Sequence, residues 1–275
     1  MRIRIAHETR YSYDAPTRSV QQVLRLTPRD HDGQHVVAWR VEPSVEGRLV
    51  AEEDHYGNRC HRFAPDVSTA EYTLTVRGEV ETQDTAGLLR GTVERLPDAI
   101  YRRDTELTAA DDAIRTFADD HAGGAELKPL DLCHRLLGAI NRDITFDTSG
   151  TDAGTSAAQA FALRRGVCQD LAHIFLASLR HLGLPARYVS GYFHRADGVT
   201  EQEAGHAWAE VKIPGLGWVG FDPANGISTT DAHVRVAIGL DYLAAAPIRG
   251  SRRGGGTERL DVRLIVDTAQ RQTQG

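Results

Sequence analysis

The sequence lacks the features that define several classes of protein. No stretch of its 275 residues is long and apolar enough to span a bilayer, so we expect no membrane partner. The first residues, Met1 to His7, contain no apolar run of the roughly 7 to 15 residues that a secretory signal needs. A cytoplasmic location is therefore the expectation.

The chain also has little cysteine and little excess charge. Its three cysteines, Cys60, Cys133 and Cys168, lie far apart, and an odd number in this arrangement does not indicate a disulfide framework. A net charge of −6 with a pI near 6.1 argues against a nucleic-acid partner. The hydrophobic content of 41% is enough for packed hydrophobic cores, in one large domain or two domains of ordinary size.

The N-terminal part reads as short strands separated by turns. Apolar and polar residues alternate in regularly spaced segments without helical periods, which is typical of a β-sandwich. We therefore predict an α+β protein whose residues 1–103 form an N-terminal antiparallel β-sandwich domain. The expected strands are Arg2 to Ala6, Val20 to Leu26, Val36 to Val41, Arg48 to Glu52, Cys60 to Phe63 and Glu71 to Glu79.

The turn around Gly57 and Asn58 has two interpretations. His55, Tyr56, Asn58 and His61 could form a binding site, because loops on rigid strands often carry function. The Gly57-Asn58 pair is also good hairpin chemistry. We favour the turn on that ground.

After Leu96 and Pro97 the pattern becomes helical. Thr108 resembles the N-cap of a helix that continues to about His121. A second apolar stripe predicts a helix from Pro129 to about Asp143.

The domain boundaries follow from this change of pattern. A second domain is predicted over residues 104–267. It ends in a C-terminal return strand, because apolar and polar residues alternate from Leu260 to Val266. Residues 268–275 are predicted to form a disordered tail.

The centre of the second domain is a helix that begins at Cys168. Apolar residues recur on one helical face as far as Leu182, and Gly183 followed by Pro185 ends the helix. Backbone N–H groups at a helix start lack partners, and the helix dipole favours negative charge there. Such a position can make a cysteine a thiolate nucleophile, although a single cysteine beside a helix start is more often part of the packing.

Two strands downstream carry a histidine and an aspartate. The runs from Gly205 to Val211 and from Trp218 to Pro223 predict a hairpin. His206 and Asp222 share a face of it only if the loop has three or five residues or a bulge intervenes, because side chains alternate along strands. With that register, Cys168, His206 and Asp222 supply a nucleophile, a base and a group that orients the base.

Four segments of the chain resemble the bacterial transglutaminase-like superfamily. They are Arg165 to His173, Gly183 to Tyr192, His206 to Glu210 and Gly217 to Gly226. The resemblance implies a transglutaminase-like, papain-like α+β core in which Cys168, His206 and Asp222 form a catalytic triad.

The resemblance extends to the N-terminal part. Gln22 to Arg29 and Tyr56 to Arg59 resemble the domain that accompanies this bacterial subfamily. Relatives often carry tyrosine where this chain has Phe146, so a hydroxyl that could assist oxyanion stabilisation is missing here. The backbone N–H of Cys168 remains the expected donor.

Two further polar residues near Cys168 have ordinary interpretations. Asp170 suits the dipole of the first helical turn. His173 lies roughly 140° around the helix from Cys168 and cannot easily reach the same substrate atom. Both are predicted to be structural, with an indirect positioning role as the alternative.

A metal site is not predicted. Cys168, His194, His206 and Asp222 are acceptable ligand types, but no short paired spacing of the kind seen in zinc sites accompanies them. No cofactor is expected either.

Together these residues predict a cysteine-dependent enzyme that acts on peptide or side-chain amides of a protein or peptide substrate through a thioester. Hydrolysis by a peptidase or amidase is placed slightly ahead of transfer to an amine by a transglutaminase, because hydrolysis needs no second binding site. The non-enzyme alternative is a catalytically silent protein-interaction module, and the intact Cys168, His206 and Asp222 weigh against it.

Overall fold

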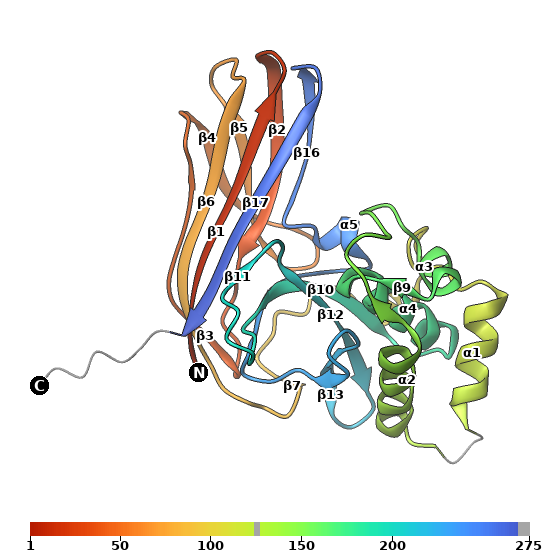
Figure 1. Ribbon diagram of the computed structural model, residues 1–275. Coiled ribbons are helices and arrows are strands. Elements are labelled where there is room, and N and C mark those ends of the chain that lie inside the picture. The colour runs from red at the N-terminus through yellow and green to blue at the C-terminus, as the bar shows by residue number, and fades with distance from the viewer. Residues whose placement is uncertain (124–126, 269–275) are drawn as a thin grey trace, which may run out of the picture.

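The computed structural model describes residues 1–123 and 127–268. A long β-sandwich stands beside a second unit in which helices cover a further antiparallel sheet (Figure 1). The predicted α+β class with N-terminal antiparallel sheets is confirmed. Among the described residues, no helix has both the length and the apolar character needed to cross a bilayer.

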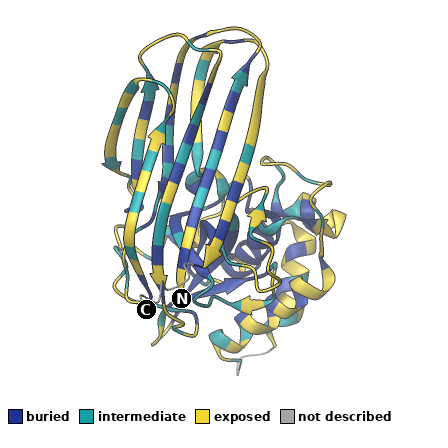
Figure 2. Ribbon diagram, turned by 60° about the vertical axis from the view of Figure 1, so that its left-hand side comes forward, coloured by how far each residue is buried: buried dark blue, intermediate teal, exposed yellow. Residues whose placement is uncertain are grey.

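The sandwich is built from strands whose side chains are alternately buried and exposed. Its strands are β1 (Arg2–Tyr13), β2 (Thr17–Thr27), β3 (Gln34–Pro43), β4 (Gly47–Glu53), β5 (Arg59–Pro65), β6 (Glu71–Thr82), β11 (Glu201–Gln202), β16 (Ile248–Gly254) and β17 (Glu258–Thr268). One sheet has the order β11-β17-β1-β6-β3 and the other β16-β2-β5-β4. Figure 2 shows the resulting alternation of buried and exposed positions along the strands. Leu24, Phe63 and Tyr72 are among the side chains buried between the sheets.

The C-terminal strands belong to this sandwich. β17 pairs with β1, and β16 pairs with β2. The prediction that residues 104–267 keep their return strand within the second domain is therefore wrong, because an alternating pattern identifies a strand but not its partner. Pairing with β17 covers an edge that β1 would otherwise leave open. Thr268 ends β17 instead of starting a tail, and the rest of the predicted tail, residues 269–275, lies outside the described residues.

The second unit, which we call the core, lies between β6 and β16 in the chain. Its helices are η1 (Ile100–Arg102), α1 (Asp112–Ala122), α2 (Pro129–Asp143), α3 (Ala157–Leu163), α4 (Cys168–His181) and α5 (Tyr242–Ala245). Its strands are β7 (Leu88–Leu89), β8 (Thr145–Phe146), β9 (Arg165–Gly166), β10 (Ala186–Phe193), β12 (His206–Ile213), β13 (Gly217–Asp222), β14 (Ile227–Ser228) and β15 (His233–Gly239). The main sheet has the order β14-β13-β12-β10-β15, and β7 pairs with β13.

Helix α4 occupies the centre of the core. It packs on β10 and β12 and is surrounded by α1, α2 and α3, so that Leu171, Ile174, Phe175 and Leu179 are fully or almost fully buried. The predicted helical stripe is confirmed. A chain segment this apolar gains stability mainly from removing its side chains from water.

The predicted N-cap of α1 is wrong. Asp111, not Thr108, caps the helix, because its carboxylate accepts a hydrogen bond from the Ile114 N–H at 2.9 Å. Thr108 is buried, and its hydroxyl accepts a hydrogen bond from the Arg180 guanidinium at 2.7 Å. The Thr108 hydroxyl therefore binds a side chain of α4 and does not cap α1.

Two side-chain amides of the sandwich close the outer edge of the core sheet at β15. Gln34 accepts from the Arg235 N–H at 2.7 Å and donates to the Arg235 carbonyl at 2.9 Å. Asn58 makes the same pair of bonds with Ile238, both at 2.8 Å. These are the bonds that a neighbouring strand would make. The turn at Gly57 and Asn58 thus does form, and its asparagine also joins the sandwich to the core.

Replacing Asn58 by alanine should lower the free energy of unfolding by about 2 to 4 kcal/mol, because it leaves the buried N–H and carbonyl of Ile238 without partners. Urea denaturation of the full chain measures the loss. Gln83→Ala is the matched control, since Gln83 is exposed and its side chain holds no strand edge. Equal stability of the two variants would contradict the role given to Asn58.

Candidate active site

The start of helix α4 is fixed by the residues around Cys168. Val167 is the N-cap, and Cys168 is the first helical residue. The Asp170 N–H donates to the Val167 carbonyl at 2.9 Å, and the Asp170 carboxylate accepts from the Val167 N–H at 2.8 Å and from the Thr151 hydroxyl at 2.6 Å. A Cβ on Gly166 would lie 2.6 Å from the Asp170 side chain, so this position needs glycine. Asp170 has the structural role predicted for it.

His173 is buried on α4 and holds α5. Its Nε2 accepts a hydrogen bond from the Tyr242 N–H at 3.0 Å, and burial, helped by the charge of Arg180, lowers the pKa of His173 to about 3. Burial, followed by the charge of Cys168, raises the pKa of the Tyr242 phenol. The neutral His173 therefore anchors the first residue of α5, which agrees with the structural role predicted for it.

The hairpin of β12 and β13 has the register that the sequence required. Ala209 faces Phe221, and Ile213 faces Gly217 across a loop of three residues. The predicted short loop is confirmed. In this register His206 and Asp222 lie on the same face of the hairpin.

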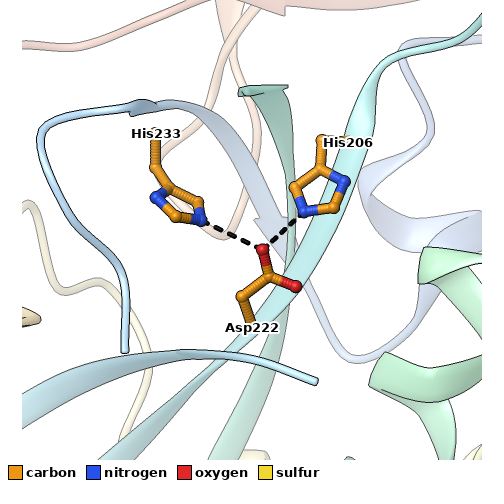
Figure 3. A group of neighbouring side chains, drawn as sticks. All are labelled: His206, Asp222 and His233. Atoms are coloured by element: carbon orange, nitrogen blue, oxygen red, sulfur yellow. Dashed lines mark hydrogen bonds and ion pairs between the residues drawn. The ribbon is translucent and has the colours of Figure 1, made fainter. Parts of the chain in front are cut away.

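His206 and Asp222 form a buried pair. The imidazole Nε2 lies 2.7 Å from the Asp222 Oδ2, and the two side chains are 12% and 0% exposed. The Asn225 amide donates to the same oxygen at 2.6 Å, and the N–H groups of Ala224 and Asn225 donate to Oδ1 at 3.1 and 3.2 Å. Figure 3 shows a second imidazole, that of His233, on the other side of the carboxylate, with Nε2 at 3.1 Å from Oδ2.

The charges of the pair stabilise each other. Burial lowers the pKa of His206, but the charge and hydrogen bond of Asp222, followed by those of Cys168, outweigh it and raise that pKa to about 10. Burial raises the pKa of the Asp222 carboxyl, yet the charge and hydrogen bond of His206 and the hydrogen bond from His233 hold it below its ordinary value. The pair is therefore an imidazolium and a carboxylate at neutral pH.

Cys168 is the other group that acts on this histidine, because its side chain contributes to the raised pKa of His206. Nε2 of His206 is directed at Asp222, so Nδ1 is the nitrogen that is left for the thiol. Cys168 is partly exposed, whereas Cys60 and Cys133 are buried and burial raises the pKa of each of their thiols to about 12. The structure thus brings Cys168, His206 and Asp222 together.

Two other positions from the sequence analysis lie outside this group. Phe146 on β8 pairs with Gly166, two residues before Cys168, and the residue is 54% exposed and its ring carries no donor. His194 follows β10 and donates its backbone N–H to the Ala232 carbonyl at 2.9 Å. The backbone N–H of Cys168, at the first position of α4, remains the predicted oxyanion donor.

Sequence reasoning missed Asn225 and His233. Asn225 has a local signal, because it is an asparagine three residues after the predicted triad aspartate, Asp222. No local signal points to His233, the first residue of β15. The His233 side chain lies near Asp222 because the strand order of the folded sheet places β15 beside β10.

His206, Asp222 and His233 are close enough in space to be considered as metal ligands. Their hydrogen bonds argue against that use. The Thr230 N–H donates to Nδ1 of His233 at 3.1 Å, so the proton of the neutral ring sits on Nε2, the atom that a metal would need.

A cysteine at the start of a buried helix, facing a histidine and aspartate pair on an antiparallel hairpin, is the arrangement of the papain-like cysteine folds. Residues 115–223 match the transglutaminase-like superfamily, and residues 3–81 match the bacterial transglutaminase-like N-terminal region. The chain belongs to the transglutaminase-like superfamily.

Individual relatives agree with this assignment. An uncharacterised protein of Mycobacterium leprae is 30% identical over 275 residues, which cover 95% of this chain and 96% of that protein. A protein-glutamine gamma-glutamyltransferase of Pseudomonas aeruginosa is 30% identical over 171 residues, covering 56% of this chain and 25% of that protein. A solved candidate cysteine protease from Cytophaga hutchinsonii shares the fold, with a TM-score of 0.78 at 20% identity over 98% of this chain and 91% of that chain.

Replacing Asp222 by asparagine should lower the pKa of His206 from about 10, because the charge of the carboxylate no longer opposes the effect of burial. At pH values between the pKa of the variant and that of the wild type, the imidazole of the variant would be neutral and that of the wild type charged. Nitrogen-15 NMR of the imidazole as a function of pH measures the shift.

Asp66→Asn is the control for this experiment, because Asp66 is an exposed carboxylate on a sandwich turn. It should leave the titration of His206 unchanged. A pKa of His206 that stays at its wild-type value in Asp222→Asn would show that the carboxylate does not hold the charge.

Proposed function

We propose that the protein is a cysteine-dependent enzyme that cleaves amide bonds of a peptide or protein through a thioester intermediate. The observation that carries the proposal is the buried pair of His206 and Asp222 beside Cys168 at the start of α4. An interaction module would not need a fully buried carboxylate that accepts a hydrogen bond from an imidazolium. Such a pair is costly to bury and is typical of a catalytic centre.

In the first step the proposed nucleophile is the Cys168 thiolate. Its proton resides on His206, and Asp222 fixes the ring through Nε2 and stabilises its charge. The sulfur forms a bond to the carbonyl carbon of the substrate amide, and the carbonyl oxygen becomes an oxyanion. The backbone N–H of Cys168 and the dipole of α4 stabilise that charge.

In the second step the oxyanion collapses and the carbon–nitrogen bond breaks. His206 donates its proton from Nδ1 to the leaving amine, which leaves a thioester on Cys168 and a neutral imidazole. His206 then accepts a proton from water as the water oxygen attacks the thioester carbonyl. The carbon–sulfur bond breaks, the carboxylic acid product leaves, and the ion pair of Cys168 and His206 is restored.

Transfer to an amine is the second candidate. It uses the same thioester, with a primary amine in place of water, so the same side chains serve both reactions. The observation that favours it is the Pseudomonas aeruginosa relative named as a protein-glutamine gamma-glutamyltransferase. We place hydrolysis first because it requires no binding site for an amine.

Incubating the protein with a pool of glutamine-containing peptides and a small primary amine should yield cleaved or deamidated peptides, detected by mass. Cys168→Ala should reduce their formation by about a thousandfold or more, because no other group replaces the nucleophile. Products that carry the amine would support the transferase instead.

Cys133→Ala is the matched control, since Cys133 is buried in α2 outside the site. It should keep the wild-type product pattern. Turnover by Cys168→Ala at the rate of this control would remove the nucleophile assignment.

A further inference from the structure

His233 is a buried residue whose side chain contacts Asp222 of the candidate triad. It is the first residue of β15, and its side chain is 2% exposed. Its Nε2 lies 3.1 Å from Oδ2 of Asp222, the same oxygen that Nε2 of His206 approaches at 2.7 Å. Two imidazoles therefore meet at one carboxylate oxygen, as Figure 3 shows.

The backbone fixes which nitrogen of His233 carries the proton. The Thr230 N–H donates to Nδ1 at 3.1 Å, so Nδ1 is an acceptor and Nε2 carries the hydrogen. Burial lowers the pKa of His233 in spite of the opposing effect of Asp222. The ring is therefore neutral and donates to the carboxylate without adding a charge.

Aromatic packing fixes the plane of the ring. The Trp208 ring meets it edge-on, with centroids 5.2 Å apart and planes at 78°. Phe193 lies against both imidazoles, with ring centroids 4.7 Å from that of His233 and 5.1 Å from that of His206. The imidazoles of both histidines thus pack against the Phe193 ring, and Asp222 lies between them.

We propose that His233 is a positioning residue, which orients the Asp222 carboxylate toward His206 by donating one neutral hydrogen bond to Oδ2. The proposal rests on the proposed function, in which Asp222 orients the catalytic base. The titratable groups that face His233 are His206 from β12 and Asp222 from β13, and Cys168 of α4 acts in turn on the pKa of His206.

A neutral donor suits this position better than a charged one. Lysine or arginine there would form its own ion pair with Asp222 and weaken the attraction that keeps His206 charged. Without any donor, Oδ2 would keep the Asn225 amide as its remaining partner besides His206. The carboxylate could then rotate away from the imidazole that it orients.

The test compares His233→Gln, which can keep a donor near Nε2, with His233→Phe, which keeps the ring and loses the donor. The probe is iodoacetamide, and the readout is the rate of alkylation of Cys168 as a function of pH, followed by peptide mass. This rate reports the thiolate and needs no knowledge of the substrate. His35→Phe is the control, because His35 is a surface residue of the sandwich with a side chain 70% exposed.

His233→Phe should slow alkylation about tenfold near pH 5.5, where an ordinary cysteine is protonated, as expected from the loss of one hydrogen bond to a charged group. His233→Gln should stay within about threefold of the wild type, and His35→Phe should not change the rate. If His233→Phe does not fold, His233→Asn replaces it, since its amide is one carbon too short to reach Oδ2. It should then show the tenfold loss.

Two outcomes would overturn the proposal. One is alkylation of the donor-free variant as fast as that of the wild type. The other is an equal loss in His233→Gln and His233→Phe, which would mean that the imidazole itself and not its hydrogen bond matters. Failure of the proposed function is distinguishable: the wild type would then be alkylated rapidly at acidic pH and yet release no product from peptides.

Discussion

A carboxylate with no exposed surface must be surrounded by donors, and the core is arranged to supply them to Asp222. They come from His206 on β12, from the turn at Ala224 and Asn225, and from His233 on β15. A buried charge that lost these partners would cost several kcal/mol. Because the donors belong to separate segments, Asp222 can be buried as an anion only when the hairpin, the turn and β15 are all in place.

The sandwich enters this arrangement through β15. That strand lies at the edge of the core sheet, and its outer backbone groups at Arg235 and Ile238 pair with the amides of Gln34 and Asn58. An unpaired edge is costly when buried and invites pairing with other chains when exposed. The sandwich thus fixes the strand whose first residue, His233, contacts the carboxylate.

The sequence could predict those features of the structure that are caused by residues close together in the chain. The helix that begins at Cys168 follows from its apolar periodicity, and the shared face of His206 and Asp222 follows from the parity of a short hairpin loop. These are properties of neighbouring residues. Two other features depend on the order of strands from distant segments, which no spacing in the sequence encodes. These are the pairing of β17 with β1 and the contact of His233 with Asp222.

The path of the chain argues that the sandwich is part of the scaffold of the site. The chain leaves the sandwich after β6 and returns at β16, so the core is an insertion between β6, which pairs with β1, and β16, which pairs with β2. The loop that leads to His206 also crosses to the sandwich, where Glu201 and Gln202 of β11 pair with β17. His206 and His233 therefore each follow a segment anchored on the sandwich, since Asp231 accepts a hydrogen bond from the Thr82 hydroxyl through its backbone carbonyl. These contacts join the sandwich to both segments that carry the imidazoles on either side of Asp222.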